Sequence, residues 1–317
     1  MTRYILTRIG QAILVVFVTY TLTFVILNLL PGDPVQIHLG AGEPLTSLTP
    51  LQVTQLKREF GLNHSLGHQY LVQLWHALHF NFGISPSLQE PVKTAISQRI
   101  GTTAKLGALA LVMMLLLTLT LSYATIVARW RWLRALLIRI PAVAVSIPGY
   151  VVGLALLDFF SFKIHIFPST GTFGLTSYIL PALTMSLGPS ALLTQVLISS
   201  SEKTLREPFI HTARAKGLTN AQVQRRHVVR NAALPTVTLL GLVLAQAVMN
   251  AVIAETVFGM SGLGRLAQEA VQGQDVELVQ ALVLIAATVF VVVNLIVDLL
   301  YPLLDPRISH TPNVVGR

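Results

Sequence analysis

The chain has 317 residues, of which 53% are hydrophobic and only 11% charged, and it contains no cysteine. Soluble domains carry about 25% charged residues, so this composition and a mean hydropathy of +0.68 exclude an ordinary soluble enzyme, a disordered chain and a disulfide scaffold. A formal net charge of +9 is typical either of nucleic-acid binding or of a membrane topology, and the positions of the charges decide between them.

Long charge-free apolar windows predict six membrane-spanning helices in one domain that covers residues 1–317. A helix needs roughly 17 to 25 apolar residues to cross about 30 Å of hydrocarbon, and a charge at its centre costs about 2.5 to 3.5 kcal/mol. The windows that meet this requirement are residues 9–30, 106–128, 140–157, 178–198, 232–254 and 278–297. Because the first window is too long for a secretory signal and no small-residue cleavage site follows it, we expect a retained signal anchor.

Residues 31–103 form a long predicted loop on the outside, which opens with Leu30-Pro31-Gly32-Asp33-Pro34. The two prolines of this motif stop the helix that leaves the bilayer. Further along, residues 60–89 carry no Asp, Glu, Lys or Arg, but they are rich in His, Asn and Gln and too polar for a lipid-exposed span. Their apolar residues recur at spacings of three and four, which predicts a helix that lies on the membrane surface or packs against the spans. These residues are Leu66, Tyr70, Leu71, Leu74, Trp75, Leu78 and Phe82.

Two histidine pairs in this stretch have spacings that could place ring nitrogens on one helical face as metal ligands. His64 and His68 are four residues apart, and His76 and His79 are three apart. However, Gly67 interrupts the first pair and no carboxylate joins either pair. Interfacial or packing roles are therefore favoured, and no metal site is predicted.

The predicted inside loop, residues 199–231, has the pattern of a docking surface. Phe209–Lys216 is typical of a short basic helix, which Gly217 can end in a left-handed conformation. Thr219 and Gln222 then have the spacing of a capping box, which predicts a second helix that continues into the fifth span. Two helices joined by a glycine turn indicate a compact, positively charged surface for a partner.

The distribution of Lys and Arg predicts that both termini are cytoplasmic. Fifteen of the 22 Lys and Arg residues fall in one set of segments, and cytoplasmic loops carry such an excess. That set consists of Arg3, Arg8, Arg129, Arg131, Arg134, Arg139, Lys203, Arg206, Arg214, Lys216, Arg225, Arg226, Arg230, Arg307 and Arg317. Because this topology explains the net charge, we expect the lipid bilayer and no nucleic acid as a partner.

No catalytic residue is predicted. The sequence has no His-Glu-x-x-His, no Gly-x-Ser-x-Gly and no phosphate-binding Gly-x4-Gly-Lys-Ser/Thr. Ser200-Ser201-Glu202-Lys203 matches Ser-x-x-Lys, but its place at a cytoplasmic helix end favours a solvated terminus. Asp158, Glu255 and Asp298 lie near span ends, which favours anchoring or interhelical hydrogen bonds over a proton relay. A proton-coupled carrier or an intramembrane enzyme that works without ATPase partners is the alternative.

A series of separated motifs covers nearly the whole chain. They are Arg3-Tyr4-Ile5-Leu6, Leu30-Pro31-Gly32-Asp33-Pro34, Phe82-Gly83-Ile84-Ser85, Ser146-Ile147-Pro148, Ile179-Leu180-Pro181-Ala182, Thr212-Ala213-Arg214-Ala215-Lys216-Gly217-Leu218, Glu255-Thr256-Val257-Phe258, Gly262-Leu263-Gly264-Arg265 and Leu304-Asp305-Pro306-Arg307. In this order they resemble the permease subunits of ATP-binding-cassette importers, and specifically the dipeptide, oligopeptide and nickel permease family.

The resemblance implies an all-α membrane protein with six transmembrane helices, similar to type I importer permeases, in a bacterial cytoplasmic (inner) membrane. It implies four partners, namely a homologous second permease subunit, two cytoplasmic ATPases and an extracytoplasmic solute-binding protein. ATP and Mg would bind to the ATPases, so this chain needs no cofactor. The residues that would couple to an ATPase are Thr212, Ala213, Arg214, Ala215, Lys216, Gly217 and Leu218. No residue is assigned to the translocation pathway.

The sequence departs from the broader importer pattern around this loop. His211-Thr212-Ala213 stands where the general motif has Glu-Ala-Ala. The segment from Gly217 to Pro235 is longer than the general spacing, as is usual in the peptide and nickel branch. Gln195 and Ile198 stand where many relatives have arginine, so that contact is not carried over.

The substrate stays open between peptides and nickel or nickel chelates, which this family's motifs do not separate. Leu74–His79 and Arg225-Arg226-His227 resemble the nickel branch, whereas Thr212–Gly217 fits peptide permeases equally well. We place peptides slightly ahead because the family is broad in peptide transport.

Overall fold

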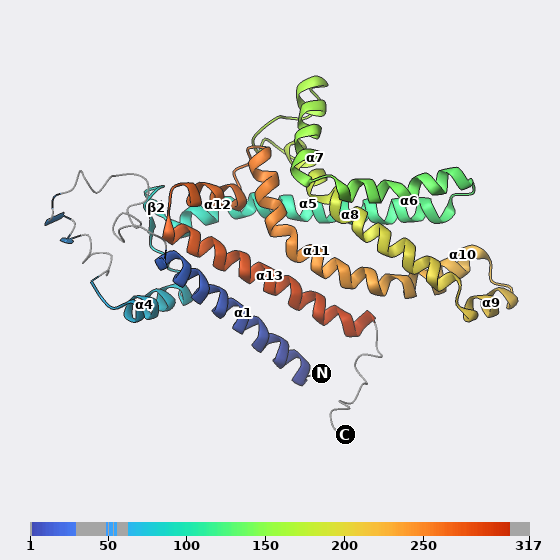
Figure 1. The fold of residues 1–317 in the computed structure, drawn as a ribbon, viewed down its shortest axis with the longest axis horizontal. Coiled ribbons are helices and arrows are strands. Elements are labelled where there is room, and N and C mark those ends of the chain that lie inside the picture. Colours follow the sequence, from blue (N-terminus) through green and yellow to red (C-terminus); the bar gives the residue numbers. More distant parts are fainter. Residues whose placement is uncertain (1, 30–48, 50, 53, 56–62, 305–317) are drawn as a thin grey trace.

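The structure is a computed structural model, and it describes residues 2–29, 49, 51–52, 54–55 and 63–304. The described chain is almost entirely helical (Figure 1). Its elements are α1 (Thr2–Leu29), α4 (Leu66–Leu78), β1 (Ile84–Ser85), β2 (Glu90–Pro91), α5 (Val92–Val127), α6 (Arg131–Ser146), α7 (Gly149–Leu156), η2 (Leu157–Lys163), α8 (Thr176–Leu205), α9 (Pro208–Ala215), α10 (Asn220–Val223), η3 (Gln224–Val228), α11 (Val229–Val257), α12 (Leu263–Gln272) and α13 (Val276–Leu304). The motif Leu30-Pro31-Gly32-Asp33-Pro34 and most of Leu304-Asp305-Pro306-Arg307 lie outside the described residues.

Among the described residues, five helices are long and apolar enough to cross a membrane. They are Leu6–Leu29, Val92–Val127, Thr176–Leu205, Asn220–Val257 and Val276–Val297, and they overlap five of the six predicted windows. Half of the most apolar window of α8 is buried against other helices, whereas only 11% of that of α1 is buried. α8 is therefore the centre of the bundle, and α1 lies at its edge with most of its apolar surface uncovered.

The remaining predicted window, residues 140–157, is not one continuous span. α6 ends at Ser146, α7 begins at Gly149, and the helical segments on either side of this break meet at 102°. Pro148 has no N–H to donate and disfavours helical backbone at the residue before it, so Ile147 is extended (φ −95°, ψ 124°). Hydropathy alone predicted a straight helix here because a turn between apolar residues leaves the window apolar.

Two predicted loops are shorter than expected because helices extend past their apolar stretches. α5 begins at Val92, so the outer loop that was predicted to end at residue 103 ends at Pro91 instead. The residues Lys93, Arg99 and Lys105 had limited the predicted span to its apolar part. Likewise α8 continues to Leu205, inside the predicted inner loop of residues 199–231.

Small side chains allow the other helices to approach α8 closely. Ala182, Ser186, Ser190, Ala191 and Thr194 are all buried on it, and α5, α6, α7 and α11 pack around it. The hydroxyl of Thr194 donates to the backbone oxygen of Ser190 at 2.7 Å, so the buried polar group is satisfied within the helix. Small and hydroxyl residues at helix contacts are typical of membrane proteins, where packing replaces the hydrophobic effect between helices.

The bundle has two distinct ends (Figure 1). At one end, which we call the hairpin end, β1 pairs antiparallel with β2 (Ile84 with Pro91, Ser85 with Glu90) beside the first turn of α13. At the opposite end, which we call the α9 end, α9, α10 and η3 connect α8 to α11. α1 and α13 run side by side between the two ends.

Candidate functional site

The helices α9 and α10 form a small unit with its own apolar core at the α9 end. Ile210, Ala213, Val223 and Val228 are buried against one another, and Leu205 and Leu218 pack against them. The core joins α9 to the start of the long helical segment Asn220–Val257, so the unit has a fixed position relative to α11.

The turn between α9 and α10 has the local chemistry that the sequence predicts. Gly217 has φ +84°, its N–H donates to the Arg214 oxygen at 2.9 Å, and the Leu218 N–H donates to the Ala213 oxygen at 3.3 Å. These two bonds make a Schellman motif. Thr219 then caps α10, because its hydroxyl accepts from the Gln222 N–H and its own N–H donates to the Gln222 side chain.

The predicted coupling residues divide between the surface and the core of this unit. Thr212, Arg214, Ala215, Lys216 and Gly217 are exposed. Neither of the two cations forms an ion pair with another described residue. Ala213 is buried and Leu218 is half-buried, so these two stabilise the unit from inside and leave only the others accessible to a partner.

A cavity of about 330 Å³ lies at the bend between α6 and α7, which sequence reasoning did not assign to any role. Its walls come from the bend, from the middle of α8 and from α11. The lining residues are Ala144, Val145, Ile147, Pro148, Gly149, Val152, Thr184, Met185, Gly188, Pro189, Leu192, Val243, Gln246, Asn250 and Ile253. None of them is charged, and the polar side chains among them are a hydroxyl and two amides. The signal that could have found it is the pair of Pro and Gly dipeptides, Pro148-Gly149 and Gly188-Pro189, within apolar windows.

A second cavity, of about 580 Å³, lies where α8 and α11 converge at the α9 end. Gln195, Lys203 and Asn231 give it a polar lining together with Ser199 and Ser200. Gln195 therefore faces this cavity, whereas Ile198 is buried in the bundle.

Two of the ionisable residues that the sequence places near span ends have local partners. Asp158 is exposed and forms an ion pair with Lys163 at 2.8 Å, as interfacial anchoring predicts. Glu255 is fully buried and accepts three hydrogen bonds from two other helices, as described next. The side chain of Asp298 lies outside the described residues.

The Glu255 carboxylate joins α5, α11 and the first turn of α12. It accepts from the Thr103 hydroxyl at 2.6 Å and from the backbone N–H groups of Gly264 at 2.6 Å and Arg265 at 3.2 Å. The free N–H groups of a helix N-terminus attract a negative charge, so this carboxylate caps α12 from a neighbouring helix. A Cβ at Gly262 would lie 2.3 Å from the carboxylate, which explains why a glycine stands there.

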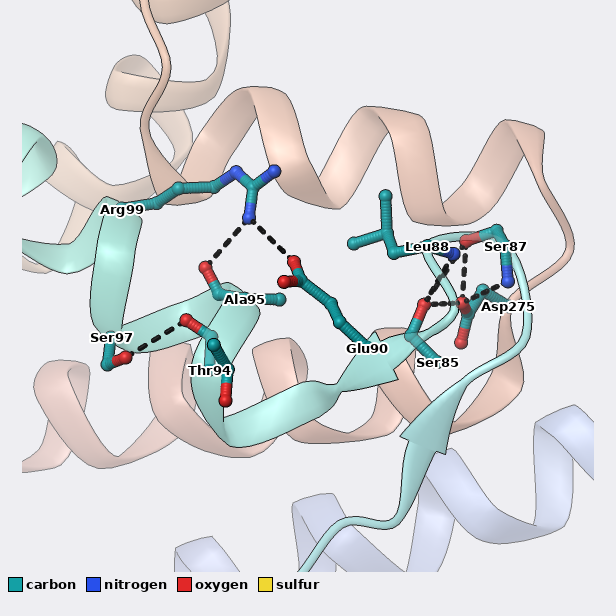
Figure 2. A network of polar contacts seen from close by, with 9 residues as sticks. All are labelled: Ser85, Ser87, Leu88, Glu90, Thr94, Ala95, Ser97, Arg99 and Asp275. Atoms are coloured by element: carbon teal, nitrogen blue, oxygen red, sulfur yellow. Dashed lines mark hydrogen bonds and ion pairs between the residues drawn. The ribbon is translucent and has the colours of Figure 1, made fainter.

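A second buried carboxylate, Asp275, was not identified from the sequence. Figure 2 shows it beside the turn that follows β1. Its Oδ2 accepts from the hydroxyls of Ser85 and Ser87 and from the Ser87 N–H at 3.2 Å, and its Oδ1 accepts from the Leu278 N–H at 2.9 Å. Asp275 therefore caps α13 and joins it to the hairpin, 190 residues away in the sequence. The local signal that could have found it is an aspartate directly before an apolar helical stretch, which is a common N-cap position.

The histidine pairs lie on or beside α4. The rings of His64 and His68 are 4.7 Å apart, and the His79 ring is 4.4 Å from that of Trp75. Within the part of the chain that the structure describes, no group of three His, Asp or Glu side chains is close enough to bind a metal ion together.

Comparison with protein families shows similarity along almost the whole chain. A family model described as binding-protein-dependent transport system inner membrane component matches residues 121–310. A second model, described as the N-terminal part of a binding-protein-dependent transport system membrane component, matches residues 1–107.

Individual relatives are similar over their full length. A dipeptide transport system permease of Lactococcus lactis subsp. cremoris (strain MG1363) is 30% identical, over 97% of this chain and 99% of the relative. A glutathione transport system permease of Escherichia coli (strain K12) is 30% identical, over 98% of this chain and 100% of the relative. A putative peptide transport system permease of Brucella abortus (strain 2308) is 31% identical, over 98% of this chain and 100% of the relative.

The fold is also similar to that of a solved structure. A crystal structure of an amino acid ABC transporter with histidines matches with a TM-score of 0.50 and 17% identity, over 68% of this chain and 94% of that chain. At this identity the likeness concerns the fold alone, and it agrees with an all-α membrane permease of the type I kind.

We predict that Gly217→Pro abolishes uptake of the transported substrate by cells while the amount of protein in the membrane stays unchanged. Proline fixes φ near −65°, about 150° from the observed value, and so removes the turn. Gly217→Asn is the matched control, because asparagine tolerates the left-handed conformation and no atom lies within 4 Å of an added Cβ. Normal uptake by the proline variant would contradict the assignment of this turn to coupling.

We predict that Asp275→Asn lowers the free energy of unfolding by about 1 to 3 kcal/mol, because an amide cannot accept from every donor that the two oxygens now satisfy. The measurement is SDS-induced unfolding of the purified protein, followed by loss of helical circular dichroism. Glu269→Gln is the control, since this carboxylate is exposed and its ion pair among the described residues is with Arg265 on the same helix. Equal effects of the two substitutions would contradict a structural role for Asp275.

Proposed function

The chain belongs to the family of binding-protein-dependent transport system inner membrane components, as an ATP-binding-cassette importer permease of the peptide branch, and we propose that it carries peptides into the cytoplasm in a complex driven by ATP. The observation that supports this proposal best is the full-length similarity to permeases of dipeptide, glutathione and peptide systems. ATP and Mg would bind to partner ATPases and not to this chain.

The chemistry of the cavity at the α6–α7 bend supports peptides over nickel. Gln246 and Asn250 offer amide groups, and Thr184 offers a hydroxyl, all of which can form hydrogen bonds with a peptide backbone. A wall without His, Asp or Glu offers a nickel ion none of the imidazole or carboxylate ligands that it prefers. We expect the homologous second permease to supply the opposite wall of the pathway.

The α9 unit would transmit the motion of the ATPases. We expect the exposed face of α9, with Arg214 and Lys216, to sit in a groove of an ATPase subunit. Because the unit has its own buried core, a displacement of α9 would move the start of α11 with it, and Gln246 and Asn250 lie further along that helix. The α9 end would then be cytoplasmic, as the distribution of Lys and Arg predicts, and the hairpin end would face the solute-binding protein.

We predict that Arg214→Glu reduces the amount of ATPase that co-purifies with the tagged permease from native membranes, because it reverses an exposed charge on the docking face. Arg129→Glu is the matched control: it makes the same charge change in an exposed position of another connection at the same end of the bundle. If both variants, or neither, lose the ATPases, Arg214 contributes only to topology or to general charge.

We predict that the complex purified by this permease contains two ATPases and a second permease, and that its ATPase activity in proteoliposomes rises with a peptide-loaded solute-binding protein. Mass spectrometry of the complex and phosphate release measure the two parts separately. Stimulation by a nickel-loaded binding protein without a peptide would overturn the substrate class. Recovery of the chain alone after gentle extraction would reopen the carrier and enzyme alternatives.

A further inference from the structure

The short helix α4 has three distinct sides. One side packs against α1 through Tyr70, whose hydroxyl lies 2.8 Å from that of Thr21 and whose ring lies 5.9 Å from Tyr20 and 5.2 Å from Phe24. Figure 1 shows α4 beside the C-terminal part of α1. The other two sides of α4 differ from each other in chemistry.

The second side is an exposed apolar flank. Leu71, Trp75 and Leu78 are spaced four and three residues apart, so they lie on one face, and they are 64%, 63% and 67% exposed. The third side is polar and carries Gln69, Gln73 and His76, which are spaced four and three residues apart. His79 lies at the border of the two flanks, because its ring is 4.4 Å from that of Trp75. No charged residue occurs in residues 60–89, so the helix has an apolar flank and a neutral polar flank.

The contact with α1 fixes the depth of α4 along the bundle. The apolar part of α1 runs from Leu6 to Leu29, 24 residues or about 36 Å of helix, which exceeds a hydrocarbon core of about 30 Å by roughly 3 Å at each end. Tyr20 and Phe24 lie about 14 Å and 8 Å before the end of α1 at 1.5 Å per residue. Tyr70 therefore contacts α1 about 5 to 10 Å below the boundary of the hydrocarbon, where the solvent is lipid.

We propose that α4 is a membrane-interface helix whose Leu71, Trp75 and Leu78 flank inserts among the lipid acyl chains at the hairpin end, with the polar flank of Gln69, Gln73 and His76 among the headgroups. An apolar face that reaches this depth is typical of interfacial helices, and tryptophan is enriched at this level. The helix that α4 packs against, α1, also leaves most of its apolar surface uncovered in the structure, as expected of a helix that faces lipid. The assignment of α4 to the outer leaflet rests on the proposed orientation of the chain. The contact of its apolar flank with lipid is independent of that orientation.

The fluorescence of Trp75 can report the surroundings of this flank once the other two tryptophans of the chain, Trp130 and Trp132, are replaced. The full chain with Trp130→Phe and Trp132→Phe is reconstituted into phosphatidylcholine vesicles with or without dibrominated acyl chains. We expect Trp75 to lose most of its emission in the brominated vesicles and to be protected from aqueous acrylamide. The matched control adds Trp75→Phe and His76→Trp, which moves the reporter to the polar flank of the same helix. We expect the emission of this control to be quenched by acrylamide and to change little in the brominated vesicles.

Each other result overturns the proposal. Quenching of Trp75 by acrylamide and not by bromolipid would place the flank in water, and protection from both quenchers would mean that protein covers it. Equal quenching of the two reporters by bromolipid would contradict the division into apolar and polar flanks. The quenching measurement needs neither ATPase nor substrate. A negative quenching result would therefore leave the proposed transport function intact, and a variant that fails to transport could still show the quenching expected for α4.

Discussion

The structure depends on one constraint, which is that a backbone N–H or C=O group in hydrocarbon has no water to bond with and must find a partner in the chain. Long helices satisfy this locally, which is why the described residues are almost all helical. A break at membrane depth is tolerated only where the chain is buried or lines a cavity. The turn at Ile147-Pro148 follows this rule, because both residues line the cavity at the α6–α7 bend. The constraint thus places irregular backbone and accessible space at the same point.

The same constraint explains the buried carboxylates at the hairpin end. Two helices begin there inside the protein, and their first N–H groups need acceptors that water does not supply. Glu255 accepts from the start of α12, and Asp275 accepts from the start of α13. Each also binds a hydroxyl from another element, Thr103 on α5 and Ser85 in the hairpin. Each of these two carboxylates therefore caps a helix and also joins that helix to another element, which fixes the geometry of this end.

Features that arise from neighbouring residues were predictable, and features that arise from distant ones were not. The apolar windows, the left-handed Gly217 and the Thr219–Gln222 capping box depend on a few adjacent residues. The structure contains five of the six windows as continuous helices, and it contains the turn and the capping box. The bend at Pro148 was missed because hydropathy does not register backbone direction. Asp275 was missed because its partners in the hairpin are far away in the sequence. Ala213 and Leu218 belong to a motif on the surface, yet only packing shows that they point into the unit.

The chemistry of the cavity limits what this chain contributes to transport. None of the described residues that line it carries a fixed charge, so these residues offer a substrate hydrogen bonds and apolar contacts in place of ion pairs. A neutral wall with a few amides and a hydroxyl suits brief contact with a polar cargo, since a site that binds weakly also releases quickly. Strong selection and energy must then enter from outside the cavity. In the proposed function, partners would supply them through the two structured ends of the bundle, one held by buried carboxylates and one by an apolar core around α9.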